Sequence, residues 1–189
     1  MIGIVGGSGD FGQGLAKRLS RVGEEVIIGS RTPREDFVSN PEACRRSDVV
    51  FLCVPPENAV KMAEDLAEGL RDRIVVSVAS SLRPPEGASL AELSAAAAPG
   101  ARFVAGFHTV SAKLLGELDH VLDEDVLLCG DDEEAKAPVA GLAERIVAGR
   151  AVDCGGLRTA RRLETLTGLL VTVNRRYRTN AGVRITGIP

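Results

Sequence analysis

The sequence has few aromatic residues, no excess of positive charge and no long apolar run. None of the 189 residues is Trp, one is Tyr and five are Phe, so few side chains could stack on bases. The 23 Lys and Arg residues face 26 Asp and Glu, and a net charge of −3 argues against binding nucleic acid through its phosphates. No apolar run approaches the ~20 residues that span a bilayer, and the opening residues lack the basic region of a signal peptide. We therefore expect a cytoplasmic protein that binds neither nucleic acid nor membrane.

The sequence also lacks a cysteine framework, because its four cysteines form no C-x-x-C pair. Cys53 and Cys129 lie inside apolar runs, which is typical of buried thiols and not of a metal or disulfide site. Hydrophobic residues make up 44% of the chain and charged residues 26%, which are ordinary globular values. The length and composition predict one domain over residues 1–189 and no bound metal.

Short β-branched runs alternate with segments of helical periodicity, an order typical of right-handed βαβ units on a mainly parallel sheet. A turn at Arg83–Pro85 and a short helix over Ala88–Ala98 interrupt the alternation. The predicted fold class is α/β, with a doubly wound sheet and a C-terminal helix. The predicted strands are Ile2–Val5, Glu25–Gly29, Asp48–Val54, Arg73–Ala79, Arg102–Phe107, Asp125–Cys129 and Ala151–Asp153. The predicted long helices are Ser8–Val22, Glu57–Leu70, Glu133–Val147 and Leu157–Tyr177.

The C-terminal segment 156–189 is predicted to be helical and basic. Residues 151–189 hold seven arginines against only Asp153 and Glu164, so positive charge is concentrated there. A solvated helix face and a docking surface for an anionic ligand are both open. The apolar residues on this helix form a seam that packs either in the core of the monomer or against a second subunit. The seam residues are Leu163, Leu166, Leu170, Val173 and Tyr177.

A glycine-rich loop, G-x-G-x-x-G, follows the first predicted strand and opens the first helix. In this context the pattern predicts a Rossmann-type dinucleotide site, with the pyrophosphate at the helix N-terminus. Gly7 is expected to make the tight turn, Gly9 to let the backbone approach the phosphates, and Gly12 to pack the helix on the strand. Asp10 is expected to cap the helix, since a carboxylate beside a phosphate is repelled. The expected loop residues are Gly7, Ser8, Gly9, Asp10, Phe11 and Gly12.

The end of the second predicted strand indicates which dinucleotide binds. An NAD site needs an acidic residue there to hold the ribose 2′-hydroxyl, but this strand ends in Ser30, Arg31 and Thr32. Arg31 offers a permanently charged guanidinium for a 2′-phosphate, and the two hydroxyls offer further donors. The sequence therefore favours NADP(H) over NAD(H).

Apolar residues follow the next two strands at the edge where open sheets bind ligands. Val54, Pro55, Val78 and Ala79 are expected to form a wall beside the nicotinamide. No Ser-His-Asp, Cys-His or H-E-x-x-H pattern occurs in the sequence. Hydride transfer needs no catalytic side chain, because the cofactor carries the reactivity and the protein positions it.

His108 follows the strand predicted over Arg102–Phe107 and should emerge at the same edge. Its role is either structural or a contact to substrate, since imidazole suits both neutral and charged hydrogen bonding. His120 is expected to lie on the surface.

Taken together, these residues resemble the NADPH-dependent coenzyme F420 reductases, also called F420H2:NADP oxidoreductases. The resemblance covers nearly the whole chain. Its glycine loop is generic, whereas the segment around Cys129 and the C-terminal segments are fairly specific. The matching segments are Gly6–Leu15, Ile28–Arg31, His108–Ala112, Cys129–Glu133, Asp153–Leu157, Leu163–Thr167, Asn174–Tyr177 and Gly182–Gly187.

The resemblance implies a homo-oligomer, expected to be a dimer, that moves a hydride reversibly between the nicotinamide C4 of NADPH and C5 of a deazaflavin. It implies that the glycine loop holds the pyrophosphate, and that Ser30 and Arg31 hold the 2′-phosphate. His108, Thr109 and Val110 would border the deazaflavin.

Two other functions stay open on the sequence. Reductases of the pyrroline-carboxylate and prephenate dehydrogenase kind share the glycine loop and a strand that ends in a proline-rich turn, but they complete their site with a larger helical domain. A non-catalytic module that senses NADP(H) would need no open face over the nicotinamide. The identity of the hydride acceptor distinguishes these functions.

Overall fold

The computed structural model describes residues 1–34, 36–81 and 87–188, whose strands form one eight-stranded sheet. The strand order is β3-β2-β1-β4-β5-β6-β7-β8, and only the β6–β7 pair is antiparallel. Because the strand order reverses at β1, the sheet is doubly wound. This arrangement confirms the predicted fold class. The strands are β1 Ile2–Val5, β2 Val26–Ser30, β3 Val38–Ser39, β4 Val49–Leu52, β5 Ile74–Ser77, β6 Arg102–Gly106, β7 Val126–Gly130 and β8 Ala151–Asp153.

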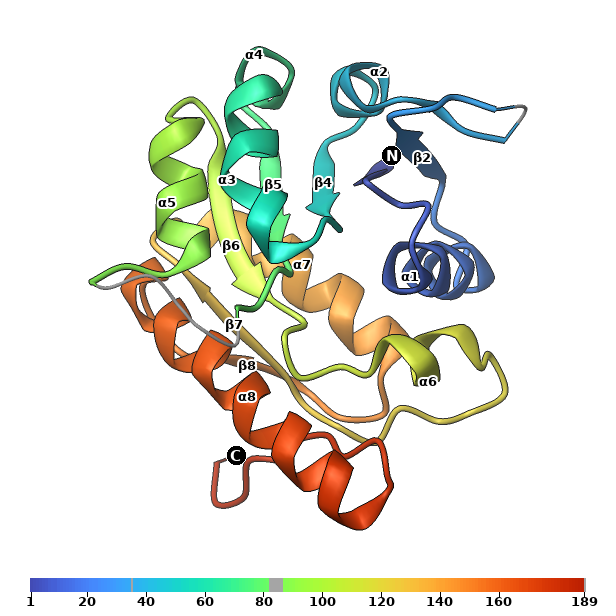
Figure 1. Cartoon of the computed structure of the whole chain (residues 1–189), viewed down its shortest axis with the longest axis vertical. Coiled ribbons are helices and arrows are strands. Elements are labelled where there is room, and N and C mark those ends of the chain that lie inside the picture. Colours follow the sequence, from blue (N-terminus) through green and yellow to red (C-terminus); the bar gives the residue numbers. More distant parts are fainter. Residues whose placement is uncertain (35, 82–86, 189) are drawn as a thin grey trace.

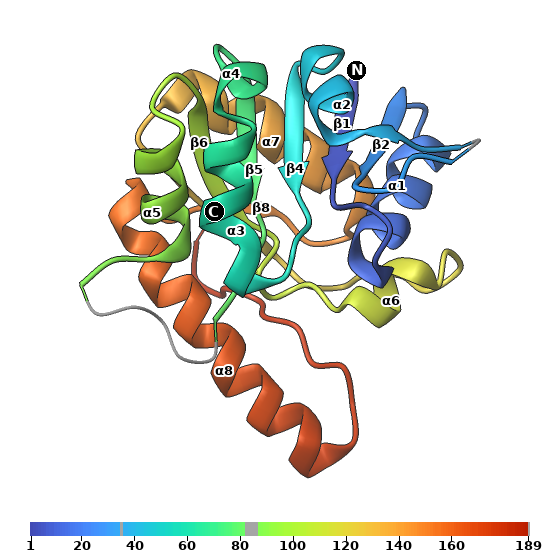
Figure 2. The same cartoon turned by 45° about the horizontal axis from the view of Figure 1, so that its top comes forward.

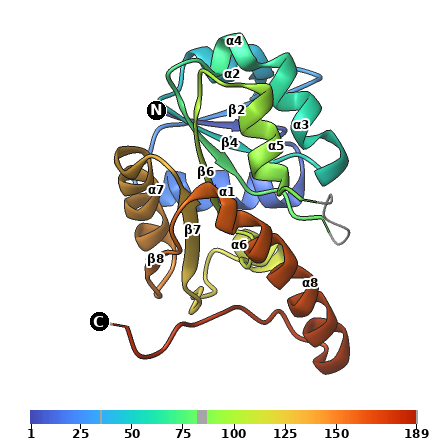
Figure 3. The same ribbon diagram turned by 90° about the vertical axis from the view of Figure 1, so that its left-hand side faces the viewer.

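Helices cover both faces of the sheet (Figure 1). Buried residues of α1, α6 and α7 pack on one face, whereas those of α2 to α5 and of the first half of α8 pack on the other. Figure 3 shows α3 and α5 on one side of the strands and α7 on the opposite side. The helices are α1 Asp10–Arg21, α2 Asn40–Arg45, α3 Pro56–Asp65, α4 Ala67–Leu70, α5 Leu90–Ala97, α6 Ala112–Gly116, α7 Glu133–Ile146 and α8 Ala160–Tyr177.

The prediction of a single helix over Glu57–Leu70 was wrong, because the segment bends at Leu66 into α3 and α4. The bend lets α4 pack closely on α2: a Cβ added at Gly69 would lie 3.2 Å from Cys44 Cβ. Three short elements, β3, α2 and α6, were not predicted from the sequence. These elements are too short for a periodic pattern, so tertiary contacts decide where they form.

The segment between β5 and β6 is described in part. The turn predicted at Arg83–Pro85 lies outside the described residues. The short helix expected over Ala88–Ala98 is α5, and its first turn carries a capping box in which the Ser89 hydroxyl accepts from Glu92 N and the Glu92 carboxylate accepts from Ser89 N. Such a box satisfies two backbone donors that the helix leaves free.

The long C-terminal helix begins as a 3-10 turn over Leu157–Thr159 and continues as α8. Leu163 and Leu170 are buried, but Leu169 is 59% exposed and Tyr177 is 69% exposed. Figure 2 shows that the distal half of α8 projects beyond the sheet. The predicted seam therefore packs in the core only over the first part of the helix. Among the described residues, no helix is both long enough and apolar enough to span a membrane.

The chain after α8 turns back toward the start of β7, where Asp125 anchors it. The Asp125 carboxylate is fully buried and accepts from Ile185 N at 2.8 Å and from Arg150 N at 2.9 Å. These backbone donors hold the pKa of Asp125 below its usual range. Arg150 also donates to Ile185 O at 2.6 Å, so the returning segment is fixed to both β7 and the chain before β8.

Candidate functional site

The carboxyl ends of β1, β2, β4, β5 and β6 meet at one edge of the sheet. The parallel register pairs Ile4 of β1 with Ile28 of β2 and with Phe51 of β4. The chain segments that follow these strands therefore lie side by side. They contain the residues predicted to bind the cofactor, and open α/β sheets bind ligands at this edge.

The glycine loop packs too closely for side chains at two of its positions. A Cβ added at Gly12 would lie 2.5 Å from Gly7 Cα, so glycine at position 12 lets α1 sit directly on the loop. Gly6 adopts the left-handed conformation, with φ of +68°, and Gly7 follows it in the same turn. Gly7 is confined between the side chains of Ile4 and Ile28, so only glycine fits there.

Gly9 faces open space at the start of α1. Apart from its chain neighbours, no heavy atom of the described residues lies within 4 Å of a Cβ built there, in contrast to Gly7 and Gly12. Gly9 is also the N-cap of α1 and supplies no side-chain cap, so the role expected for Asp10 was wrong. Asp10 is the first helical residue and contributes only its charge to the first turn. The first N–H groups of a helix lack intrahelical acceptors, so an open helix start of this kind suits an anion.

Side chains around the loop fix its shape. Gln13 Nε2 donates to Ser8 O at 2.7 Å, and Asn40 Oδ1 accepts from Gly6 N at 3.3 Å. Phe11 packs on the core from the first turn of α1. Asn40 is buried at the start of α2, so this short helix supports the loop from behind.

The end of β2 presents polar groups beside the glycine loop. Gly7 N donates to Gly29 O at 3.2 Å, which joins the loop to the end of this strand. Ser30 is buried, and its hydroxyl accepts from Thr32 N at 3.2 Å. Arg31 and Thr32 are exposed, and Arg31 forms no ion pair with any residue that the structure describes. Its guanidinium is thus available to a phosphate next to the loop.

Two of the four residues predicted to form an apolar wall pack together at neighbouring strand ends. Val54 and Ala79 are buried in one cluster with Ala59 and Leu90. Val54 also lies against the loop, since a Cβ at Gly6 would come within 2.4 Å of its Cγ1. Val78 is half-buried and packs on the opposite face of the sheet, and Pro55 is exposed and precedes the first residue of α3.

His108 is buried at the end of β6, where its imidazole lies against the backbone of Ala79, and neither ring nitrogen forms a hydrogen bond of regular geometry with the described residues. Burial lowers the pKa of its imidazole to about 4, and the nearby backbone of Ala79 opposes only part of this shift. The ring is therefore uncharged at neutral pH. Thr109 Oγ1 is likewise buried without a partner, and Val110 is buried in the core. Buried polar atoms normally have partners, so unpaired ones at a ligand-binding edge indicate donors and acceptors available to a ligand.

The turn that carries His108 is strained and is held by α8. Phe107 has φ of +65°, a conformation that costs about 1–3 kcal/mol for a residue other than glycine. The Thr167 hydroxyl donates to His108 O at 3.0 Å and lies 3.1 Å from the Ser80 hydroxyl. A single side chain of α8 therefore links the chain after β5 to the chain after β6.

A buried carboxylate makes a second link between α8 and the site. Glu164 accepts from Leu90 N at 3.1 Å and from Ala91 N at 3.2 Å, at the first turn of α5. Burial raises the pKa of this carboxyl. Negative charge at a helix N-terminus is stabilising, so Glu164 fixes α8 against α5 at this edge.

Sequence reasoning missed four of these residues: Asn40, Ser80, Glu164 and Thr167. One usable signal existed, because Ser39 followed three residues later by Glu42 is the spacing of a helix N-terminus, and Ser39 caps α2. Nothing in the sequence pattern indicates that Thr167 reaches Ser80, since the two residues are 87 positions apart.

The fold and the site together define an NADP-dependent oxidoreductase with a Rossmann-type sheet. A crystal structure of an Arthrobacter sp. FB24 protein assigned to the F420-dependent NADP reductases matches the fold with a TM-score of 0.88. That match has 24% identity and covers 98% of this chain and 99% of the other. The structure of Plasmodium falciparum pyrroline carboxylate reductase with NADP bound matches with a TM-score of 0.68 at 13% identity, and the match covers only 64% of that chain.

Sequence comparison identifies the family. The family model described as "NADP oxidoreductase coenzyme F420-dependent" matches residues 1–81. The F420-dependent NADP reductase of Methanocaldococcus jannaschii is 35% identical over 99% of this chain and 98% of its own length. The enzyme of the same name from Methanothermobacter thermautotrophicus is 36% identical, over 100% of this chain and 95% of its own length. The chain belongs to the F420-dependent NADP reductases. Both alignments extend over 221 positions, so these relatives carry insertions relative to the 189 residues of this chain.

Proposed function

We propose that this edge of the sheet holds NADP(H) and the deazaflavin of coenzyme F420 face to face, for reversible hydride transfer between them. The observation that carries the proposal is the open start of α1 at Gly9 beside the free guanidinium of Arg31. With the pyrophosphate at the start of α1 and the 2′-phosphate at Arg31, the nicotinamide would lie along the edge of the sheet toward Val54 and Ala79. The residues proposed to bind NADP(H) are Gly7, Ser8, Gly9, Asp10, Phe11, Gly12, Ser30, Arg31, Thr32, Val54, Pro55, Val78 and Ala79.

The acceptor half of the proposed site lies at the end of β6 and on α8. The two bound ring systems supply the hydride chemistry, and the protein positions them and excludes water. His108 is neutral and buried, so a ring nitrogen that does not face the Ala79 backbone would hydrogen-bond to a ligand without adding charge. Thr109 would offer its unpaired hydroxyl. Val110 supports this turn from the core.

Transfer of isotope tests the proposed function. NADPH carrying deuterium at the transferred C4 position should deliver it to C5 of oxidised F420 in the presence of the protein. Mass spectrometry of the reduced F420 should show one retained deuterium, because direct transfer leaves no exchange with solvent. Reduced F420 that carries only solvent hydrogen would contradict direct transfer.

Thr167 is expected to affect turnover through the positions of the two strand ends. Thr167→Val keeps the shape of the side chain but loses the bonds to His108 and Ser80, so we expect kcat to fall about tenfold because of misplacement. Thr167→Ser should retain most activity. Thr179→Val is the matched control, since Thr179 is exposed just beyond the end of α8. Similar kinetics for the Thr167 and Thr179 valine variants would contradict this role.

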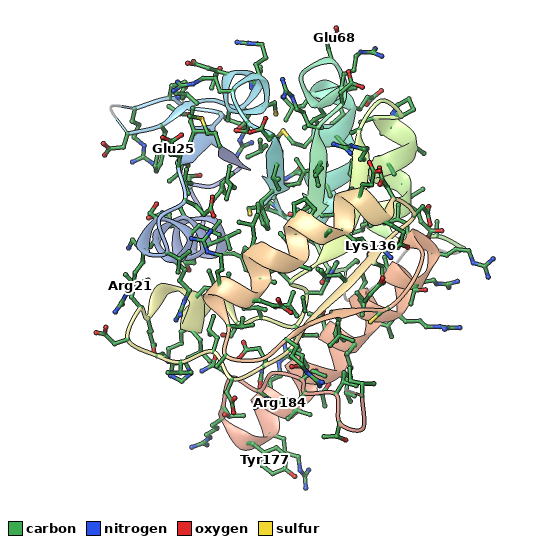
Figure 4. The ribbon with its side chains drawn as sticks, turned by 180° about the vertical axis from the view of Figure 1, so that it is seen from behind. Arg21, Glu25, Glu68, Lys136, Tyr177 and Arg184 are labelled. Carbon is green, nitrogen blue, oxygen red and sulfur yellow. The ribbon has the colours of Figure 1, made fainter. Side chains whose placement is uncertain are left out.

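We also propose that the protein is a homodimer that uses the projecting half of α8. Leu169 and Tyr177 are exposed, and Val173 lies between them at the same helical spacing. Figure 4 shows Tyr177 at the far tip of the molecule, away from the sheet. Large exposed apolar side chains aligned on a helix favour burial against a second copy. A second subunit would also cover the open edge of the sheet.

Sedimentation at micromolar concentration should give the mass of a dimer, and Leu169→Glu should give the mass of a monomer. A charge at this position would be buried without a partner in the dimer, which is costly. The exposed Val121→Glu is the control and should leave the dimer intact. A monomeric wild type would contradict the proposal.

The basic segment 156–189 is proposed to attract the anionic tail of F420. Arg175 lines a groove of about 510 Å³ together with Ser81, Thr172 and Leu169, so the groove reaches the chain after β5 and borders the proposed subunit interface. Replacing Arg175 and Arg176 by Gln should raise the KM for F420 more than that for NADPH. The effect should be largest in low salt, since screening weakens such fields. Equal changes in the KM for F420 and the KM for NADPH would contradict the proposal and would indicate that the basic residues only form a solvated helix face.

We propose a cytoplasmic location for the protein. All four cysteines are free thiols, which is typical of a reducing compartment.

A further inference from the structure

Two cysteines lie opposite each other on neighbouring strands, far from the proposed cofactor edge. The parallel register pairs Leu128 of β7 with Asp153, the last residue of β8, and the next residue along each segment is a cysteine. Cys154 N donates to Leu128 O at 2.7 Å and Gly130 N donates to Gly155 O at 3.0 Å, so the residues on both sides of Cys129 are bonded to the segment that holds Cys154. Opposed residues on adjacent strands lie about 5 Å apart with their side chains on the same face. Disulfides span Cα distances of about 4.4–6.8 Å, so this pair has suitable spacing.

The two thiols interact directly, and the interaction makes them unequal. Cys129 is fully buried, whereas Cys154 is partly exposed. The Cys154 thiol donates to Val152 O at 3.6 Å, and the closeness of the two thiols lowers the pKa of Cys154 and raises that of Cys129. Nearby Asp153 opposes the first effect, but Lys136 binds its carboxylate at 2.6 Å. Figure 4 places Lys136 near the N-terminal end of α7.

The other two cysteines have the opposite character. Burial raises the pKa of the Cys44 thiol to about 11, and burial also raises the pKa of Cys53. The reactive form of cysteine is the thiolate, so Cys44 and Cys53 should be inert. They serve as internal references for the reactivity of Cys154.

We propose that Cys154 and Cys129 form a peroxide-reactive dithiol, in which Cys154 is the attacking thiol and Cys129 the resolving thiol. The Cys154 thiolate attacks one oxygen of hydrogen peroxide, and the O–O bond breaks. Hydroxide is the leaving group, and Cys154 becomes a sulfenic acid. The Cys129 thiol then attacks that sulfur, an S–S bond forms, and the sulfenic oxygen leaves as water. Two thiols are oxidised and one peroxide is reduced, with two waters formed in all. Disulfides in reducing compartments are usually transient and redox-sensing, as this one would be.

The position of the pair gives the modification a structural consequence. Only Gly155 and Gly156 separate Cys154 from the turn that begins at Leu157. Cys129 shares a core cluster with Leu157, Ala160 and Leu163, so it lies under the start of α8. A disulfide would fix β8 to β7 at the point where the chain enters the helix that contacts the site.

Treatment of the folded protein with hydrogen peroxide, followed by peptide mapping, tests the proposal. The wild type should lose two of its four free thiols and two hydrogen atoms in mass, with a bond between the peptides that contain Cys129 and Cys154. Dithiothreitol should restore all four thiols. Cys154 should react about tenfold or more faster than Cys53. A single oxidised cysteine without a bond, a bond to another cysteine or a bond between chains would overturn the proposal.

Two variants separate the two roles. Cys129→Ser should stop at a sulfenic acid on Cys154 that dimedone traps, and Cys154→Ser should leave Cys129 reduced. The double variant Cys44→Ser/Cys53→Ser is the matched control and should form the disulfide at the rate of the wild type. The peptide map of the oxidised wild-type protein needs no substitution, so it tests the proposal even if a variant fails to fold. Equal oxidation of Cys129 in the presence and absence of Cys154 would refute the assigned order.

Discussion

Replacing Gly9 with valine is expected to weaken NADPH binding by about a hundredfold or more while the fold stays intact. A Cβ at this position meets no atom of the described residues within 4 Å apart from its chain neighbours, so the free protein has room for a small side chain there. It would occupy the space where a pyrophosphate must approach the first N–H groups of α1. Losing two charge-assisted hydrogen bonds at about 1.5–3 kcal/mol each corresponds to at least a hundredfold change in affinity. Titration of the protein with NADPH measures this loss.

Gly141→Val is the matched control for Gly9→Val. Gly141 also faces open space, but it lies on α7, away from the loop. Its substitution should change the dissociation constant of NADPH by less than about threefold, and it should not weaken α7, because valine has a higher helix propensity than glycine. A dissociation constant of Gly9→Val within the same range, with a native circular dichroism spectrum, would contradict the placement of the pyrophosphate.

Replacing Arg31 with alanine is expected to weaken NADPH binding by about tenfold to a hundredfold and to leave NADH binding nearly unchanged. Arg31 is exposed beside the glycine loop and forms no ion pair in the described structure, so its loss removes only a contact to ligand. A charge-assisted contact to the 2′-phosphate accounts for about 1.5–3 kcal/mol. NADH lacks this phosphate, so the ratio of the two dissociation constants reports the contact directly.

Arg46→Ala provides a control for the change in net charge. Arg46 pairs with Glu42 at the end of α2 and lies outside the proposed site. Its removal should lower the affinities for NADPH and NADH equally and only slightly, through the general field. Equal losses for both cofactors in Arg31→Ala would remove the assignment of Arg31 to the 2′-phosphate.

The sequence was sufficient to predict the main sheet, because β-branched runs and helical periodicity are local features. Each predicted strand corresponds to an observed one. The direction of β7 was not predictable in this way, since antiparallel pairing with β6 depends on how α6 and the chain after it return to the sheet. β3 and α2 were missed because two and six residues carry no periodic signal.

The donor half of the site was more predictable than the acceptor half for a related reason. A glycine loop and the residues at the end of β2 are close in sequence, and their spacing has a known physical meaning. The groups around His108 come from segments far apart in the chain, such as Ser80 on one side and Thr167 on the other. Only the packing of α8 across the sheet brings them together.

The most direct measurement of the central claim is turnover with the proposed pair of substrates. Purified protein mixed with NADPH and oxidised F420 should bleach the absorbance of the deazaflavin, and NADP+ with reduced F420 should restore it. NADH should be a much poorer donor, because it lacks the phosphate expected at Arg31. Catalysed loss of F420 absorbance that depends on NADPH is the predicted result. Tight binding of NADPH with no catalysed transfer to F420 in either direction would contradict the account.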